Sequence, residues 1–298
     1  MESEGISVLI PVYNYNVSKL ADSLLSQFIL LKIPFEIRVY DDGSNFNFKE
    51  QHRTALKKDG VVYQEIPQNI GRAAIRNKLA KEALYKNLLF LDCDDEIIKE
   101  DYIAQYLSIL QHYEVATGGV RYQDVPPHNK EFQLHWMAGK FREEFTPEQM
   151  EETYYFPLKN IFIKKSVFLN TLLDDSLLQY GHEDTLFGQM LKEKGVVIKH
   201  LDNPVLHAGL NRTTDFLKKT ILAVENLAYL NKTGSFRLTT KLTSTADLLK
   251  KWRVTSIVYY TLKCVEPLIK KNLVSHRPNL FLFDLFKLFH YMDKLRKA

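Results

Sequence analysis

Short apolar runs alternate with longer amphipathic segments over the first hundred residues. The short runs are rich in β-branched and aromatic residues and predict buried strands at Ile6–Val12, Phe35–Tyr40, Val61–Ile66 and Leu88–Leu91. Helical periodicity predicts helices at Lys19–Leu31 and Arg72–Lys86. Because this alternation is typical of βαβ units, we predict an α/β fold with a mostly parallel central sheet flanked by helices.

Polar residues cluster directly after two of the predicted strands. An Asp-Asp-Gly-Ser run at 41–44 follows the second strand, and an Asp-Cys-Asp-Asp run at 92–95 follows the fourth. In open α/β sheets, ligands bind outside the carboxyl ends of the strands, at the point where the strand order reverses. We therefore expect these clusters to meet in one site.

The pattern is less regular in the middle of the chain and helical at its end. Val115–Tyr122 and Val196–Leu201 predict further strands, and Gln179–Lys194 predicts a loop followed by a helix. Residues 123–159 show no clear period, and we interpret them as insertions that contribute to substrate choice. From Thr213 onward the pattern is helical, so we expect a helical C-terminal extension.

Composition and charge narrow the class of protein. The chain has 298 residues, of which 45% are hydrophobic and 26% are charged, so a disordered chain and a disulfide-bonded mini-protein are excluded. The net charge of +4 is unevenly distributed: residues 1–207 hold 23 basic and 30 acidic side chains, whereas residues 208–298 hold 17 and 6. A basic segment of this kind favours phosphate-bearing partners, which include a membrane surface, a phosphate-linked substrate and a nucleic acid.

The sequence also predicts a location. Two cysteines, Cys93 and Cys264, suit a reducing compartment, and the acidic N-terminus lacks the features of a signal peptide. No apolar stretch approaches the ~18 residues that a transmembrane helix requires. We therefore expect a cytoplasmic protein, either free or peripheral on the inner face of the plasma membrane.

The last segment, Asn279–Ala298, combines a wide apolar face with a narrow polar stripe. Its aromatic residues are Phe281, Phe283, Phe286, Phe289 and Tyr291. Such a helix packs either against the rest of the protein or a second subunit, or on an anionic membrane surface. Nucleic acid is disfavoured as a partner, because no recognised binding motif accompanies the basic charge.

The carboxylates at 92–95 are the strongest chemical signal. Asp92, Asp94 and Asp95 supply hard oxygen ligands suited to Mg²⁺ or Mn²⁺, and like charges this close are costly unless a cation or hydrogen-bond donors offset them. The alternative is a helix N-cap before Ile97. His207 is a second candidate ligand at the end of a strand-like segment, although a lone histidine is more often structural.

Three further clusters each have a simpler alternative. The 41–44 run is also a common turn sequence. Arg72 and Arg76 share one helical face after an Asn-Ile-Gly sequence and suit a diphosphate, but a solvated basic face has the same pattern. Glu183 and Asp184 supply paired carboxylates at a helix entry, where they also serve as caps.

The order and spacing of these motifs resemble the family 2 glycosyltransferases of the GT-A fold. The resemblance covers about residues 5–210 and rests on Ile10-Pro11-Val12-Tyr13-Asn14, the 41–44 run, Asn69–Asn77, Leu91–Asp95 and Gly181–Asp184. It implies an inverting enzyme with a nucleotide-sugar donor and a divalent metal held by an Asp-x-Asp motif. It also implies a catalytic domain at residues 1–210, with residues 211–298 as a basic helical extension.

The resemblance assigns a role to each candidate residue. It places Pro11, Tyr13, Asp41 and Asp42 at the nucleotide base, Arg72 and Arg76 at the nucleotide and its diphosphate, and Asp92 at the ribose or donor sugar. It assigns the metal, Mn²⁺ or Mg²⁺, to Asp94 and His207. It makes Asp184, beside Glu183, the general base that removes the acceptor proton.

The leading hypothesis is therefore the transfer of a single hexosyl or N-acetylhexosaminyl group. The expected donor is a UDP-sugar, and the expected acceptor is a saccharide or glycolipid in bacterial-type surface polysaccharide assembly. Two departures from the family pattern are Ile75, where Ala is common, and the lack of the Gln-x-x-Arg-Trp motif of processive synthases. The alternatives are a nucleotidyltransferase of similar fold and a catalytically silent docking paralogue.

Overall fold

The chain divides into two compact units, here called the first and the second unit. The computed structural model describes residues 3–153, 157–175, 181–233 and 238–297. The first unit comprises Met1–Gln123, Glu144–Leu178 and Glu183–Gly209, and the second comprises Asp124–Glu143, Gln179–His182 and Leu210–Ala298. Residues 124–143 thus pack with the chain beyond 210. The catalytic role of residues 1–210 stays a prediction.

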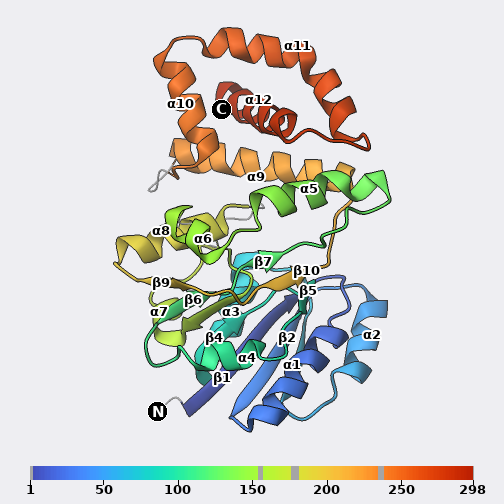
Figure 1. The fold of residues 1–298 in the computed structure, drawn as a ribbon, viewed down its shortest axis with the longest axis vertical. Coiled ribbons are helices and arrows are strands. Elements are labelled where there is room, and N and C mark those ends of the chain that lie inside the picture. The colour runs from blue at the N-terminus through green and yellow to red at the C-terminus, as the bar shows by residue number, and fades with distance from the viewer. Residues whose placement is uncertain (1–2, 154–156, 176–180, 234–237, 298) are drawn as a thin grey trace. The chain divides into compact units, whose positions relative to one another are not determined.

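A seven-stranded sheet forms the centre of the first unit (Figure 1). Its strands, in spatial order, are β3 (Val61–Ile66), β2 (Phe35–Asp42), β1 (Ser3–Val12), β4 (Tyr85–Phe90), β8 (Ile161–Lys164), β6 (Val115–Thr117) and β9 (Ile198–His200). β1 pairs in parallel with both β2 and β4, whereas β8 is antiparallel to its neighbours. The strand order reverses beside β1, so the carboxyl ends of β1, β2 and β4 lie at the switch point where ligands bind.

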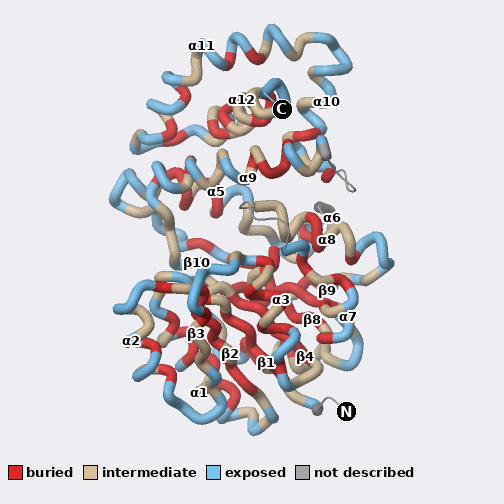
Figure 2. The backbone as a smooth tube through the Cα atoms, turned by 180° about the vertical axis from the view of Figure 1, so that it is seen from behind, coloured by how far each residue is buried: buried red, intermediate tan, exposed pale blue. Residues whose placement is uncertain are grey.

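Helices cover both faces of this sheet because the strands are apolar on both sides. Val8 and Ile10 of β1 pack on one face with Leu24 of α1, while Leu9 of β1 packs on the other with Leu79 of α3. Figure 2 shows these strands as the buried centre of the unit. The helices of this unit are α1 (Ser18–Leu31), α2 (Phe46–Ala55), α3 (Arg72–Glu82), α4 (Tyr102–Leu107), α6 (Pro147–Thr153), α7 (Lys165–Leu169) and α8 (Glu183–Glu193).

A second, three-stranded sheet lies in the same unit. It consists of β5 (Asp95–Ile97), β10 (Val205–His207) and β7 (Val120–Arg121), with β10 in the middle. The single strand predicted at Val115–Tyr122 is therefore wrong, because β6 belongs to the large sheet and β7 to the small one. The chain turns between them at Gly118, where a Cβ atom would lie 2.1 Å from the Asn203 carbonyl oxygen.

Asn160 connects the two sheets. Its buried side-chain oxygen accepts hydrogen bonds from the hydroxyls of Tyr102 (2.5 Å) and Tyr106 (2.7 Å). Its amide donates to the carbonyls of Gly119 (2.7 Å) and Asn203 (2.9 Å). One side chain thus satisfies four polar groups in the interior.

Most predicted elements of the first unit are present with shifted ends. The helix predicted at Arg72–Lys86 ends at Glu82, because β4 begins at Tyr85. Residues 123–159 are more regular than expected, since they contain three helical segments, and the unpredicted strand β8 follows directly after them. Tyr180 and Gln179, in the predicted loop, lie outside the described residues.

The second unit is helical. It contains the 3-10 helix η1 (Lys130–Phe132) and the helices α5 (Gln133–Arg142), α9 (Thr213–Thr233), α10 (Lys241–Lys251), α11 (Thr255–Leu273) and α12 (Leu280–Lys297). Leu134 of α5, Leu217 of α9, Leu262 of α11 and Phe286 of α12 share one core. Asn279 caps α12, since its side-chain oxygen accepts from the backbone N–H of Phe281 at 2.8 Å.

The apolar face of the last helix is buried within the second unit itself. Of its five aromatic residues, Phe283, Phe286, Phe289 and Tyr291 are buried, and only Phe281 is exposed. α12 contacts α9, α10 and α11. The hypothesis that this face meets a membrane or a second subunit was based on an uncovered apolar face, and that face is covered by helices of the same unit.

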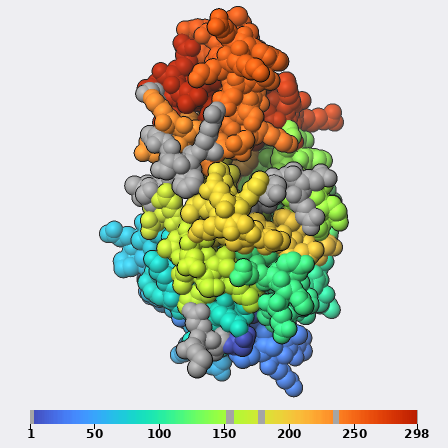
Figure 3. All heavy atoms as spheres, turned by 90° about the vertical axis from the view of Figure 1, so that its left-hand side faces the viewer, coloured from blue at the N-terminus to red at the C-terminus, as the bar shows by residue number. Residues whose placement is uncertain are grey.

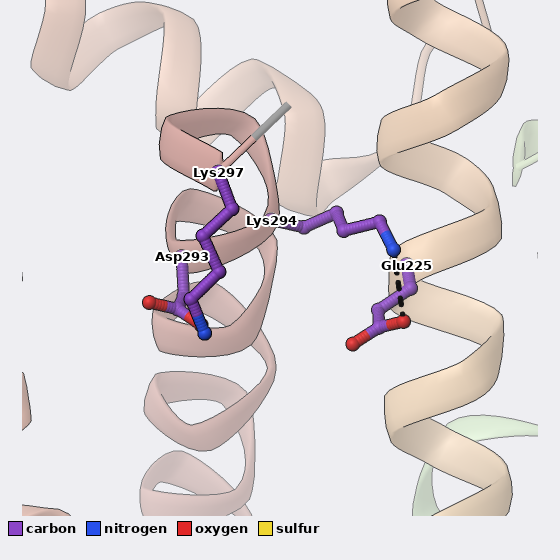
Figure 4. A pocket seen from close by; sticks show the side chains of 4 residues that line it. All are labelled: Glu225, Asp293, Lys294 and Lys297. Carbon is purple, nitrogen blue, oxygen red and sulfur yellow. Dashed lines mark hydrogen bonds and ion pairs between the residues drawn. The ribbon is translucent and has the colours of Figure 1, made fainter.

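A small hollow lies between α9 and α12 (Figure 4). Its four lining side chains are charged, and they form two ion pairs: Lys294 with Glu225 at 3.1 Å and Lys297 with Asp293 at 2.7 Å. Opposite charges thus neutralise one another in this hollow. Among the described residues, no helix is long and apolar enough to cross a membrane.

Candidate active site

The ends of β1 and β2 are tied together by Asp41 and the turn that follows it. The Asp41 carboxylate is fully buried and accepts from the Ser44 backbone N–H at 2.7 Å. The Ser44 hydroxyl in turn accepts from the Asn14 backbone N–H at 2.8 Å, just after β1. Pro11 and the exposed Tyr13 lie on this same stretch. The Asp41 carboxylate therefore shapes the site indirectly, by holding the backbone at Ser44.

Asp42 fixes the loop that leads into α3. Its two carboxylate oxygens accept from the backbone N–H groups of Ile70 (2.8 Å) and Gly71 (3.2 Å). Burial raises the pKa of Asp42 even though these two N–H groups oppose the shift. Gly43 lets the turn after β2 lie close to the backbone at Asn69. Its φ is +80°, and a Cβ atom there would lie 2.7 Å from the Asn69 nitrogen.

The two arginines of α3 differ in their surroundings. Arg76 is 5% exposed and its guanidinium donates to an Asp92 carboxylate oxygen at 2.5 Å. Burial disfavours the Asp92 anion, but the charges of Arg76 and Arg72 outweigh it and hold the pKa of Asp92 below its usual value. The Arg72 side chain is about half exposed, with Nη1 3.8 Å from a Glu183 carboxylate oxygen. Arg72 is thus the more accessible cation for a phosphate ligand.

The run at 92–95 forms a turn that is followed by a strand. The Asp92 backbone N–H donates to an Asp95 carboxylate oxygen at 2.9 Å, and β5 begins at Asp95. The helix-cap interpretation of these carboxylates is therefore wrong. Because β5 is antiparallel to β10, the register places Asp95 opposite His207.

Asp94, Asp95 and His207 form one cluster in which ligand atoms from all three lie within 4.8 Å of one another. His207 Nδ1 is 3.6 Å from Asp94 Oδ1 and 4.0 Å from Asp95 Oδ1. Asp95 Oδ1 is buried and has no hydrogen-bond partner among the described residues. Two carboxylates and an imidazole fit a divalent cation such as Mn²⁺, which would satisfy that oxygen.

The raised pKa values in this cluster also favour a bound cation. Burial, together with the Asp92 charge, raises the pKa of Asp94 to about 6. Burial likewise raises the pKa of Asp95 well above its usual value, and the charges of Asp92 and Asp94 add to the effect. Crowded anions of this kind gain most from a bound cation.

The first turn of α8 brings a second pair of carboxylates to the site. Asp184 Oδ1 accepts from the Thr185 backbone N–H at 2.7 Å. Burial and the adjacent Glu183 charge raise the pKa of Asp184 to about 6, while Arg76 and Arg72 oppose the shift. A carboxylate with this pKa is ionised at neutral pH and is a stronger base than an ordinary aspartate.

The structure brings together several residues that the sequence analysis selected separately. Arg76 meets Asp92, Asp94 meets His207, and Arg72 approaches Glu183. Asp41 differs from this group because it is completely buried. Among the described residues, its carboxylate contacts Ser44, Tyr63 and His52.

Sequence reasoning missed several residues that shape the site. His52 of α2 is fully buried, with Nδ1 3.8 Å from Asp41 Oδ2. Lys159 supplies a positive charge that favours the ionised forms of Asp92, Asp94 and Asp95. Gly209 leaves room for Asp94, since a Cβ atom there would lie 2.1 Å from the carboxylate. Asp95 is among the carboxylates that suit a metal by sequence, but the family resemblance assigns it no role. No local pattern marks the other three, although Gly209 follows the His207 motif directly.

The chain matches the model of a protein family and also individual relatives. The model of the family described as glycosyl transferase family 2 matches residues 7–171. An uncharacterised glycosyltransferase of Rickettsia conorii is 26% identical over 253 residues, and one of Rickettsia felis is 25% identical over 252 residues. Each match covers 82% of this chain but only 41% of the relative. The chain thus spans about two fifths of the length of these relatives.

Solved structures show the same fold. Staphylococcus aureus TarS 1-349 aligns with a TM-score of 0.50 at 18% identity, over 98% of this chain and 90% of that one. Its complex with UDP-GlcNAc gives the same TM-score and identity, over 98% and 91%. The mannosyltransferase PcManGT of Pyrobaculum calidifontis, in complex with GDP-Man and Mn²⁺, aligns with a TM-score of 0.53 at 13% identity, over 77% and 65%. These similarities support the predicted GT-A architecture.

Proposed function

Because the chain belongs to glycosyl transferase family 2, we propose that it transfers a single sugar, with inversion, from a nucleotide-sugar to a hydroxyl of a saccharide or glycolipid acceptor. The observation that carries this proposal is the approach of Arg72 to Glu183. It joins the helix that bears the phosphate-binding candidates to the helix that bears the candidate base. One site thus has groups for both the donor and the acceptor.

The donor half of the proposed site uses the ends of β1, β2 and β4. Tyr13 is exposed beside Pro11 and offers a ring to the nucleotide base, while Asp41 and Asp42 hold the two loops that border it. Arg72 binds the diphosphate, and Arg76 orients Asp92 toward the ribose or donor sugar through their hydrogen bond. A positive guanidinium stabilises the charge that develops on the departing diphosphate.

Asp94 and His207, with Asp95, are the proposed holders of a divalent metal, Mn²⁺ or Mg²⁺. When bound, the metal supplies a positive charge for the diphosphate. PcManGT, a structural neighbour, is known with GDP-Man and Mn²⁺, which supports a divalent metal as the proposed cofactor. TarS is known with UDP-GlcNAc, which supports a UDP-sugar as the proposed donor.

Asp184 is the proposed general base. In an inverting displacement, one carboxylate removes the proton of the acceptor hydroxyl as its oxygen attacks the anomeric carbon. The bond between that carbon and the diphosphate breaks on the opposite side, and the proton stays on Asp184 until it passes to solvent. Glu183 adds negative charge that raises the basicity of Asp184.

A panel of nucleotide-sugars with and without Mn²⁺ tests the proposal. The donor should raise the melting temperature of the chain and release its nucleoside diphosphate slowly by hydrolysis, and a ligand at 100 times its Kd stabilises by about 2.7 kcal/mol. Asp184→Asn should lower transfer about 10²- to 10⁴-fold while donor binding stays nearly unchanged. Pyrophosphate release from a nucleoside triphosphate, or equal loss of binding and transfer in Asp184→Asn, would contradict it.

A further inference from the structure

α11 of the second unit has two apolar faces, and the described residues cover one of them. Tyr259, Leu262, Ile269 and Leu273 are buried on the inner face, which packs against α12. On the outer face, Ile257 is 69% exposed and Leu268 is 68% exposed. Large aliphatic side chains this exposed are unremarkable singly, but a row of them indicates a contact surface.

The outer residues form a continuous row. Ile257, Tyr260, Cys264 and Leu268 are spaced by three, four and four positions, which confines them to an arc of about 80° on the helix. Tyr260 and Cys264 are also exposed. Trp252, in the turn between α10 and α11, is 64% exposed and precedes Ile257 by five residues in the chain. We call Trp252 and these four residues the outer row.

Basic side chains border the outer row. Residues 241–274 contain seven Lys or Arg residues against two acidic ones, Asp247 and Glu266. Glu266 forms an ion pair with Lys270. The exposed basic residues nearest the row in sequence are Lys250, Lys251, Arg253, Lys263, Lys270 and Lys271. Figure 2 shows α11 largely in pale blue, and Figure 3 shows orange atoms of the second unit on the face that it draws.

We propose that the outer row and its basic border dock on an anionic lipid bilayer. An apolar row with tryptophan and tyrosine suits the interface between headgroups and acyl chains, and the lysines suit the anionic headgroups. A second copy of this face would bring like charges together. A nucleic acid would bind the lysines but would leave Ile257 and Leu268 in water.

This surface differs from α12, for which the sequence analysis left membrane contact as one of two alternatives. The aromatic face of α12 is buried in the core of the second unit, whereas the weaker pattern of α11 is exposed. The inference does not depend on the proposed sugar transfer, since it rests on residues of the second unit alone. Docking of this kind would hold the chain at a surface where glycolipids are found.

Vesicle binding of the full 298-residue chain tests the proposal. Phosphatidylcholine vesicles containing about one third phosphatidylglycerol should sediment the chain, and pure phosphatidylcholine vesicles should sediment much less of it. Added salt should weaken the binding. With Trp136→Phe as background, Trp252 emission should shift to shorter wavelength on binding, because Trp136 is buried and Trp252 is the exposed indole.

Two sets of variants separate the apolar and the electrostatic contributions. Lys251→Gln/Lys263→Gln/Lys271→Gln should weaken binding about a hundredfold, since each lysine near an anionic surface contributes about fivefold. The matched control, Lys19→Gln/Lys57→Gln/Lys81→Gln, removes the same charge from exposed positions of the first unit and should bind as the parent does.

The apolar variant Ile257→Ser/Leu268→Ser should abolish the Trp252 shift and weaken binding at least tenfold. Its control, Ile29→Ser/Leu30→Ser, changes exposed side chains of α1 and should have no effect. Circular dichroism and melting curves confirm that each variant is folded. Equal binding by the variants and their controls would overturn the proposal. So would a dimer, detected by light scattering, that Ile257→Ser/Leu268→Ser dissociates, or tight RNA binding without vesicle binding.

Discussion

The raised pKa of Asp184 predicts an acid limb in the pH profile of the proposed transfer. A general base acts only when it is deprotonated, so activity should fall as the pH drops through its pKa. Burial and the Glu183 charge place this pKa at about 6, against an ordinary value of 3.8. Below pH 6 the rate should therefore fall about tenfold for each pH unit.

The size of the effect distinguishes the raised pKa from an ordinary one. With a pKa of about 6, Asp184 is ionised in about one molecule in eleven at pH 5. With a pKa of 3.8 it would be ionised in more than nine molecules in ten at the same pH, and the rate would scarcely change. The expected loss between pH 7 and pH 5 is therefore about tenfold.

The assay is transfer at saturating donor and Mn²⁺, with kcat/KM for the acceptor measured between pH 4.5 and pH 8. Asp94 also has a pKa raised to about 6, and its protonation would weaken metal binding. Repeating the profile at several Mn²⁺ concentrations separates the two, because a limb that belongs to Asp184 does not move with the metal. A folded state at pH 5 is checked by circular dichroism.

Glu183→Gln provides the internal test. Its removal of a negative charge should lower the pKa of Asp184 and move the limb to lower pH, since the Glu183 charge raises that pKa. Asp184→Asn should leave a residual rate without the limb. The reasoning is refuted if the limb lies near pH 4, if Glu183→Gln leaves it in place, or if Asp184→Asn retains it.

Three further predictions concern the metal cluster, the buried ion pair and the junction of the sheets. Asp94→Asn should reduce the Mn²⁺-dependent rise in melting temperature to near zero. The melting temperature without metal should stay level or rise, because the Asp94 carboxylate has a raised pKa beside Asp92. A full Mn²⁺ response would show that Asp94 is not a metal ligand. Arg76→Gln should destabilise the chain by about 3–5 kcal/mol in urea unfolding, because it leaves the Asp92 charge without its partner; a loss below ~1 kcal/mol would contradict this role. Asn160→Ala should lower the free energy of unfolding by about 4 kcal/mol, since four buried polar groups each lose a hydrogen bond worth about 1 kcal/mol. A urea midpoint close to that of the parent chain would disprove this prediction.

The sequence predicted the parts of the fold that depend on local periodicity. β1, β2, β3, β4 and the first helix follow from runs of apolar residues with a period of two or 3.6, and these elements begin or end within a few residues of the expected positions. β8 was missed because it is four residues long and pairs with strands far away in the chain. The split between β6 and β7 was missed because it depends on the contact of Gly118 with Asn203.

The sequence also selected most of the candidate site, but as separate clusters. Parallel strands bring their carboxyl ends to one edge of a sheet, so Asp42 and Asp92 were expected to lie near one another. The pairing of His207 with Asp94 depends instead on the antiparallel register of β5 and β10, which joins segments about 110 residues apart. His52 and Lys159 act through space, and nothing in their neighbouring residues marks them.

By itself, the sequence determined the class of fold, the family resemblance and the chemical types of the site residues, because periodicity and motifs are local properties of the chain. The tertiary structure decided which carboxylates are buried, which are paired with arginine and which form a cluster with His207. It also decided between the two alternatives for the last helix, burying the apolar face of α12 within the second unit, and it exposed the outer face of α11, for which the sequence analysis made no prediction. An amphipathic pattern shows that a face will be covered, whereas only packing determines which apolar face finds a partner within the chain.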